Sequence, residues 1–277
     1  MGAEPALRIE TLAEQLRALG VRPGDVLIPH VAMRDLVPVE NGPKGVLAAL
    51  RRAVGANGTL LFHVPCETSG NVAEADQRIA VGRQMAGGDG FDPLKGPPRG
   101  RLGEFARAVI ADADMKIAAH PAARFAATGK QAVKLLEPMP WDDPLGPDSP
   151  LDRLCALQGK VLDFGVDTAT LTIGSLADYY AVPRSRAIIL RHYRTRENGR
   201  SFVRSVRLLD DKDEHRYDEG FDAAKRQNFA KTGKLGRTQA TLYEAAPLLR
   251  YLSRKFGGPD LFRTVLRVYE PVTPARR

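Results

Sequence analysis

Cysteine, long apolar runs and the common ligand-binding motifs are scarce in this chain, and each shortage excludes a class of protein. Two cysteines in 277 residues, Cys66 and Cys155, are too few for a disulfide framework, so we expect two buried thiols. No stretch reaches the roughly 18 apolar residues of a membrane span, and the N-terminus lacks the apolar core of a signal peptide. We therefore expect a soluble, cytoplasmic protein without a membrane contact.

Motifs for metals, nucleotides and nucleic acids are missing as well. No set of His and Cys residues has the spacing of a zinc ribbon, so we expect no metal site. Neither a P-loop nor a Gly-x-Gly-x-x-Gly motif is present. The basic residues are dispersed and come without a zinc-finger, helix-turn-helix or aromatic RNA-binding signature, which argues against nucleic acid as a partner.

Positive charge, by contrast, is in excess. The 41 Lys and Arg residues outnumber the 33 Asp and Glu residues, which gives a formal net charge of +8. This balance favours an anionic ligand, such as a nucleotide, a coenzyme or an acidic carrier protein. A solvated basic surface without a specific partner is the alternative.

Strands and helices alternate along the first 64 residues. The spacing predicts a helix over Thr11–Gly20, capped by Thr11, and then a strand over Val26–Ile28. Pro43 begins a second predicted helix, and Thr59–Val64 is a second predicted strand. This order with short connections indicates an α/β protein.

The C-terminal half continues the mixture of strands and helices. Ile188–Leu209 is typical of a β-hairpin, with an Asn-Gly turn at its centre. We predict a polar amphipathic helix over Tyr217–Lys231, a strand over Leu235–Leu242 and a helix over Ala245–Phe256. No repeat or linker divides the chain, so we expect residues 1–277 to form a single domain.

One stretch, from Gly159 to Asp178, organises the rest of the chain. It reads GKVLDFGVDTATLTIGSLAD. The apolar run Val161–Val166 predicts a buried strand, and the hydroxyl-rich turn after it is suited to capping a helix. Open α/β sheets bind their ligands at such strand-to-helix junctions. We therefore expect the chemistry of this protein at this turn.

Several segments carry a resemblance to a known family, above all DPLGPDSPLDRLCALQGKVLDFGVD and GKLGRTQATLYEAAPLLRYL, with LRALGVRPGDVLIPHVAMRDL, FDPLKGPPRGRLGEFAR and HPAARFAATG in the same order. The chain resembles the aminoglycoside 3-N-acetyltransferases, also called antibiotic N-acetyltransferases. The resemblance implies one α/β domain with a central mixed sheet flanked by helices, distinct from the GNAT fold. It also implies transfer of an acetyl group from acetyl-CoA, or of another acyl group from its acyl-CoA, to an amine. In the family a histidine held by a carboxylate removes the proton.

The chain departs from the family at that histidine. Counted without a gap, the family's Asp, Thr, His and Glu positions fall on Ala169, Thr172, Ser175 and Asp178. Serine cannot replace the base, because its alkoxide is not available at neutral pH. Where the family has His-Ser-Ser in an early loop, this chain has His30-Val31-Ala32, so both hydroxyl groups are missing.

The resemblance supplies candidate site residues. The candidates for chemistry are Thr172 as a donor to a developing oxyanion, Ser175 as a hydrogen-bonding group or nucleophile, and Asp178 or His120 in proton transfer. Structural roles are the alternative for each. The candidates for coenzyme binding are Val31, Ala32, Met33, Arg34, Arg99 and Arg101, through backbone amides and phosphate pairing. Arg124 stands where the family usually has serine.

Three interpretations follow. The first is an acyl-CoA-dependent N-acyltransferase with an altered site. The second is a biosynthetic enzyme with a different acceptor or donor, the donor being an acidic acyl carrier protein in one version. The third is a relative without turnover that binds a ligand or partner. Because aminoglycosides are polycations and this chain is basic, an amino sugar, a sugar nucleotide or an amino-acid-like amine is favoured as acceptor. A homodimer is left open.

Overall fold

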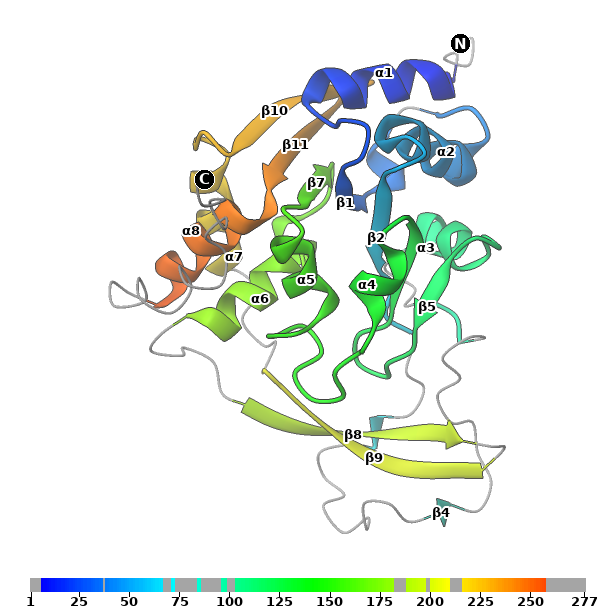
Figure 1. The fold of residues 1–277 in the computed structure, drawn as a ribbon, viewed down its shortest axis with the longest axis vertical. Helices are drawn as coiled ribbons and strands as arrows, with labels where there is room; N and C mark the ends of the chain where they lie inside the picture. Colours follow the sequence, from blue (N-terminus) through cyan, green and yellow to red (C-terminus); the bar gives the residue numbers. More distant parts are fainter. Residues whose placement is uncertain are drawn as a thin grey trace, which may run out of the picture.

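A central mixed sheet dominates the computed structural model, which describes residues 6–36, 38–66, 71–72, 84–85, 96–98, 103–181, 188–197, 200–209 and 216–257. Its strands are β1 (Val26–Val31), β2 (Thr59–His63), β5 (Lys116–Ala118), β6 (Phe125–Gly129), β7 (Lys160–Phe164), β10 (Ala230–Leu235) and β11 (Thr238–Glu244). They lie in the order β10-β11-β7-β1-β2-β6-β5 (Figure 1). β1 pairs in parallel with β2 and β7, and the outer pairs are antiparallel. The predicted mixed sheet is confirmed.

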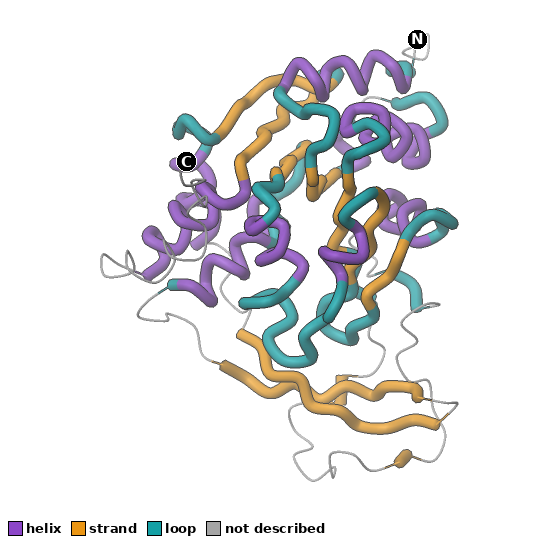
Figure 2. Tube along the Cα trace, in the orientation of Figure 1, coloured by secondary structure: helices purple, strands orange, loops and turns teal. Residues whose placement is uncertain are grey.

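Helices cover both faces of this sheet (Figure 2). One layer consists of α1 (Ile9–Leu19), α2 (Gly42–Val54) and α3 (Gly103–Ile110). The other consists of α4 (Ala132–Leu136), α5 (Pro150–Ala156), α6 (Ile173–Tyr180), α7 (Arg216–Ala224) and α8 (Ala245–Gly257). Because side chains alternate along a strand, Leu27 packs with the first layer and Ile28 with the second. The sheet therefore separates two apolar cores.

A second, four-stranded sheet lies beside this body (Figure 1). It consists of β3 (Asn71–Val72), β8 (Ile188–Glu197), β9 (Arg200–Leu209) and β4 (Gln84–Met85), in that order. β8 and β9 form the predicted hairpin, paired from Ile188↔Leu209 to Glu197↔Arg200. None of the described helices has the length and apolarity that crossing a bilayer requires.

Two local predictions are corrected at helix ends. α1 begins at Ile9, before Thr11, so Thr11 is not its cap; the Ile9 amide instead donates to Glu40 Oε2 at 3.0 Å. The helix predicted over Tyr217–Lys231 ends at Ala224. Turn residues follow, and β10 begins at Ala230 as an edge strand in which Lys231, Thr232 and Lys234 are exposed, like the polar face of a surface helix.

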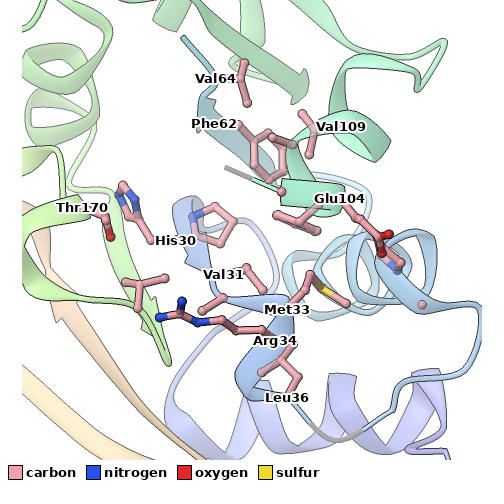
Figure 3. Close-up of a pocket in the computed structure, with 18 of the residues that line it drawn as sticks. His30, Val31, Met33, Arg34, Leu36, Phe62, Val64, Glu104, Val109 and Thr170 are labelled. Atoms are coloured by element: carbon pink, nitrogen blue, oxygen red, sulfur yellow. The ribbon is translucent and has the colours of Figure 1, made fainter. Parts of the chain in front are cut away.

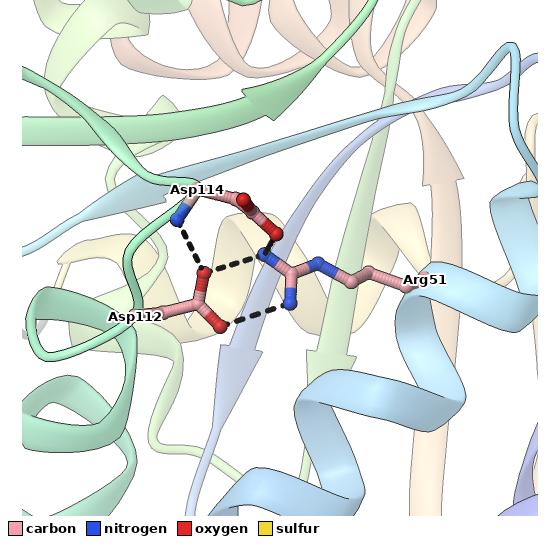
Figure 4. A network of polar contacts seen from close by, with 3 residues as sticks. All are labelled: Arg51, Asp112 and Asp114. Carbon is pink, nitrogen blue, oxygen red and sulfur yellow. Dashed lines mark hydrogen bonds and ion pairs between the residues drawn. The ribbon is translucent and has the colours of Figure 1, made fainter.

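An ion pair joins the first helical layer to the turn before β5 (Figure 4). The Arg51 guanidinium on α2 donates to both oxygens of Asp112, at 2.7 and 2.9 Å. Asp114 contributes its amide to Asp112, at 3.1 Å, and its carboxylate to Arg51, at 3.7 Å. The hydrogen bond from Arg51 lowers the pKa of Asp112. A partly buried bidentate pair of this kind stabilises more than an exposed one.

The contribution of this pair can be measured against an exposed pair on the same helix. Asp112→Asn should lower the free energy of unfolding by about 1–2 kcal/mol, because it removes a charge-assisted bidentate contact. Glu10→Gln, which weakens the exposed ion pairs of Glu10 with Arg52 and Arg17, should cost less than about 0.5 kcal/mol. Urea denaturation of both variants tests this, and equal losses would contradict it.

Candidate active site

The turn after β7 is built around a buried carboxylate. All five residues of β7 are buried, and Asp163 near its end accepts a hydrogen bond from the Val166 amide at 3.2 Å. Burial raises the pKa of Asp163. Gly165 takes a positive φ of 71°, which lets the chain turn into the short 3-10 helix η3 (Thr168–Thr170) and then α6. The junction thus forms as predicted, with an added 3-10 turn.

A pocket of ≈ 760 Å³ opens at the carboxyl ends of β1 and β2 (Figure 3). The register His30↔Asp163 and Val31↔Phe164 sets the end of β1 beside the end of β7. From the turn after β7, Val166, Asp167 and Thr170 reach the pocket. The loop residues predicted to bind coenzyme also line it: Val31, Ala32, Met33 and Arg34, the last two in the 3-10 helix η1 (Met33–Asp35).

The pocket has a polar rim and an apolar interior. Arg34, Glu104 and Asp167 are exposed at the rim. The buried lining is supplied by β2, by α3 and by the segments beside them: Val39, Phe62, Val64, Phe105, Ala106 and Val109. Sequence reasoning missed Glu104 and this apolar lining; the only signal was an acidic residue at the start of an amphipathic helix.

His30 lies in the pocket wall, on the same side as Thr170 (Figure 3). Its Nε2 atom is buried and has no hydrogen-bond partner within the described ranges. Burial lowers the pKa of His30 to about 4, so the imidazole is neutral near pH 7. A neutral imidazole both donates and accepts a hydrogen bond, so His30 is able to bond a ligand; His63, whose Nε2 atom is also buried, lines the pocket as well.

The sequence comparisons agree with this geometry. The family model for aminoglycoside 3-N-acetyltransferases matches residues 28–256. The chain belongs to this family. Aminoglycoside N(3)-acetyltransferase III of Serratia marcescens is 30% identical over 91% of this chain and 99% of its own length. The crystal structure of aminoglycoside acetyltransferase AAC(3)-Xa superposes with a TM-score of 0.81 at 25% identity, over 91% of this chain and 93% of that one.

A further solved structure extends the likeness in fold. AAC-IIIb, solved as a binary complex with CoASH, has a TM-score of 0.78 at 22% identity and covers 92% of this chain and 100% of its own. Acetyl-CoA is the acyl donor of the family. The fold predicted from the sequence, an antibiotic N-acetyltransferase fold and not a GNAT fold, is confirmed.

The two positions that correspond to the family's His and Glu lie on α6, outside the lining of the pocket. Ser175 is half-buried, and its amide donates to the Thr172 carbonyl at 3.1 Å. Asp178 is buried and accepts a hydrogen bond from Tyr217 Oη at 2.5 Å. The Tyr217 ring also packs over Gly174, where a Cβ atom would lie 3.2 Å from it. The geometry thus favours a structural role for Asp178.

Thr172 is the N-cap residue of α6, and its side chain makes no capping bond. Its Oγ1 atom is buried, and within the described segments it has no hydrogen-bond partner. It is also absent from the pocket lining, whereas Thr170, two residues earlier, is part of it. Its role as an oxyanion donor stays a prediction.

His120 is held on both sides of its ring. Nδ1 accepts from the amides of Ala122 and Ala123, both at 3.1 Å, so the proton is on Nε2, which donates to the Trp141 carbonyl at 2.8 Å. Trp141 Nε1 in turn donates to the Ser205 carbonyl on β9, at 2.8 Å. His120 therefore ties the second sheet to the main body, and this geometry favours a structural role over proton transfer.

Of the three other arginines that the sequence singled out, the structure describes Arg124 but not Arg99 and Arg101. Arg124 is fully buried, and its guanidinium donates to the Val64 carbonyl at 2.9 Å and the Gly96 carbonyl at 2.8 Å. It bonds backbone beneath the end of β2 and does not line the pocket. Arg99 and Arg101 lie outside the described residues. Within the described ranges no cluster of His, Cys, Asp and Glu could hold a metal ion.

The buried His120 makes a pH-dependent contribution to stability. Burial lowers its pKa to about 4 in the folded protein, below the 6.5 of a free histidine. The unfolded chain therefore binds the proton first as the pH falls, and stability is lost between about pH 6.5 and pH 4. This group should cost about 2 kcal/mol of unfolding free energy between pH 7 and pH 5. Urea denaturation of wild type and His120→Asn at both pH values isolates it; parallel losses in the two proteins would contradict the assignment.

Proposed function

We propose that this protein is an N-acyltransferase that moves an acetyl or other acyl group from coenzyme A to an amine of a small molecule. The observation that carries the proposal is the pocket of ≈ 760 Å³ whose wall contains Val31–Arg34. Its volume is in the range of small-molecule and cofactor sites. Family membership supports the donor class.

The loop at the end of β1 is suited to the pantetheine arm. The Ala32 amide donates to the Phe164 carbonyl at 3.1 Å, which holds the loop against β7. Met33 and Arg34 follow in η1 and line the pocket, so the proposal sets this loop beside the amide or phosphate oxygens of the coenzyme. The exposed Arg34 side chain adds positive charge at the rim.

Proton transfer has to proceed without the family's histidine. The amine nitrogen attacks the thioester carbonyl carbon, the C–S bond breaks, and the proton lost by nitrogen ends on the coenzyme sulfur. With its pKa lowered to about 4 by burial, His30 accepts a proton only weakly at neutral pH. His120 and Asp178 are held by other bonds. We therefore propose that the substrate binds as an already neutral, free amine, so that most of its deprotonation does not depend on a side chain of the protein.

The acceptor in this proposal is not a polycationic aminoglycoside. The chain carries a net charge of +8, and six arginines lie between Ile188 and Leu209 in the hairpin. A positive field of this kind repels a polycation and attracts anionic or zwitterionic substrates. An amino sugar, a sugar nucleotide or an amino-acid-like amine in a biosynthetic pathway fits better. The same charge supports an acidic acyl carrier protein as an alternative source of the acyl group.

A second candidate is a binding protein without turnover. It is favoured by the bonds of two residues expected to do chemistry, because Asp178 is paired with Tyr217 and His120 with backbone groups. The two candidates share the pocket and differ in whether a bound thioester reacts. A single domain over residues 1–277, a homodimer and a cytoplasmic location remain parts of the proposal.

Coenzyme binding is the first test. Isothermal titration should give a micromolar Kd for acetyl-CoA or CoA. Ala32→Trp, which places an indole in the pocket, should weaken binding at least tenfold, and Ala18→Trp on the exposed face of α1 should leave it unchanged. Absence of binding at millimolar concentration would remove coenzyme A from the proposal.

Acceptor choice is the second test. Kanamycin-type aminoglycosides should be acetylated with a kcat below about 1 per second, the lower end of ordinary enzymes. Ser175→His, which restores the family's base, should raise the rate about tenfold or more, and Ser175→Ala should not. Rates at or above about 1 per second in the unmodified protein would establish aminoglycosides as good substrates and end the proposal of another acceptor.

A further inference from the structure

The interior of the pocket is an opening inside the apolar core of the first helical layer. Six of the buried residues that line it belong to one apolar cluster, and each is at most 7% exposed: Val39, Phe62, Val64, Phe105, Ala106 and Val109. The Phe62 and Phe105 rings meet edge to face, with centroids 5.9 Å apart. No hydroxyl, amide or charged side chain stands among these six residues; the polar lining groups with buried atoms are the imidazoles of His30 and His63, within the part of the chain that the structure describes.

The charged groups of the pocket lie at its exposed rim instead. Arg34, Glu104 and Asp167 are all exposed lining residues, and Figure 3 shows the first two. A ligand that fits this arrangement has a polar end near the rim and an apolar end inside. The six apolar side chains of the interior offer a longer hydrocarbon chain more contact than the methyl of an acetyl group uses.

The pantetheine arm is a poor occupant for the interior. It carries two amides and a hydroxyl, and polar groups buried there without partners would each cost about 1–3 kcal/mol. A hydrocarbon chain has no such groups, and its burial against Phe62, Val64 and Val109 is favourable. The interior therefore suits the acyl group better than the arm that carries it.

We propose that the acyl group held by this protein is a hydrocarbon chain longer than acetyl, with its tail in the pocket interior. The inference rests on the proposed function and specifies its donor. The pantetheine arm then lies along Val31–Arg34, and the thioester lies between this loop and the His30 and Thr170 side of the wall. An acyl group attached to coenzyme A and one attached to a carrier protein share this chemistry.

A chain-length series tests the assignment. Kd should be measured by titration for CoA and for acetyl-, butyryl-, hexanoyl- and octanoyl-CoA. Each added methylene should tighten binding about fourfold until the interior is filled. A Kd that stays constant or rises beyond acetyl would overturn the long-chain donor and leave the proposed function standing. Absence of binding by every thioester and by CoA would instead overturn the proposed function.

Two substitutions on α3 locate the tail. Ala106→Leu narrows the interior and should weaken octanoyl-CoA at least tenfold while the Kd of CoA stays unchanged. Ala108→Leu makes the same change on the same helix outside the lining and should alter neither Kd. Equal effects of the two variants would place the tail elsewhere. If Ala106→Leu does not fold, the wild-type series alone decides. Octanoyl-pantetheine separates the sources, because a carrier-borne chain requires it to bind as tightly as octanoyl-CoA.

Discussion

The parallel pairing of β1 with β7 is the constraint on which the site depends. It sets His30 opposite Asp163 and Val31 opposite Phe164, so two strands end together and their following loops share one edge of the sheet. Asp163 turns the chain at that edge by accepting the Val166 amide. A shift of one residue in this register would move His30 to the other face, and the loop Val31–Arg34 would no longer frame the pocket.

The two faces of the sheet carry different parts of the site. The pocket interior belongs to the apolar core beneath α2 and α3, whereas α6, with Ser175 and Asp178, packs in the core of the opposite face. The two faces meet at the strand ends, where His30 and Thr170 line the pocket. Ser175, at the position of the family's missing histidine, lies on the α6 side, away from the loop proposed to bind the coenzyme.

Sequence reasoning succeeded where the determining interactions are local. Pro43 stands at the start of α2, β8 and β9 pair as the predicted hairpin, and the loop after β1 reaches the pocket. It could not reach interactions between distant residues. The bond between His120 and Trp141 spans 21 residues, and the bond between Tyr217 and Asp178 spans 39. No local sequence pattern indicates such partners, so the sequence left both a structural and a catalytic role open for His120 and Asp178.

The line of bonds from His120 through Trp141 to Ser205 has a consequence for mutational surveys. It is one of the attachments between the main body and the arginine-rich hairpin, and the loop that carries it also bonds Arg207 through Asp142 and Asp143. A survey that scores activity alone would rank His120 among the residues of the reaction, since its loss loosens the attachment of the hairpin and with it the folded protein. Conservation in relatives would strengthen the same misreading. A histidine that joins two parts of the fold can thus be mistaken for a catalytic residue.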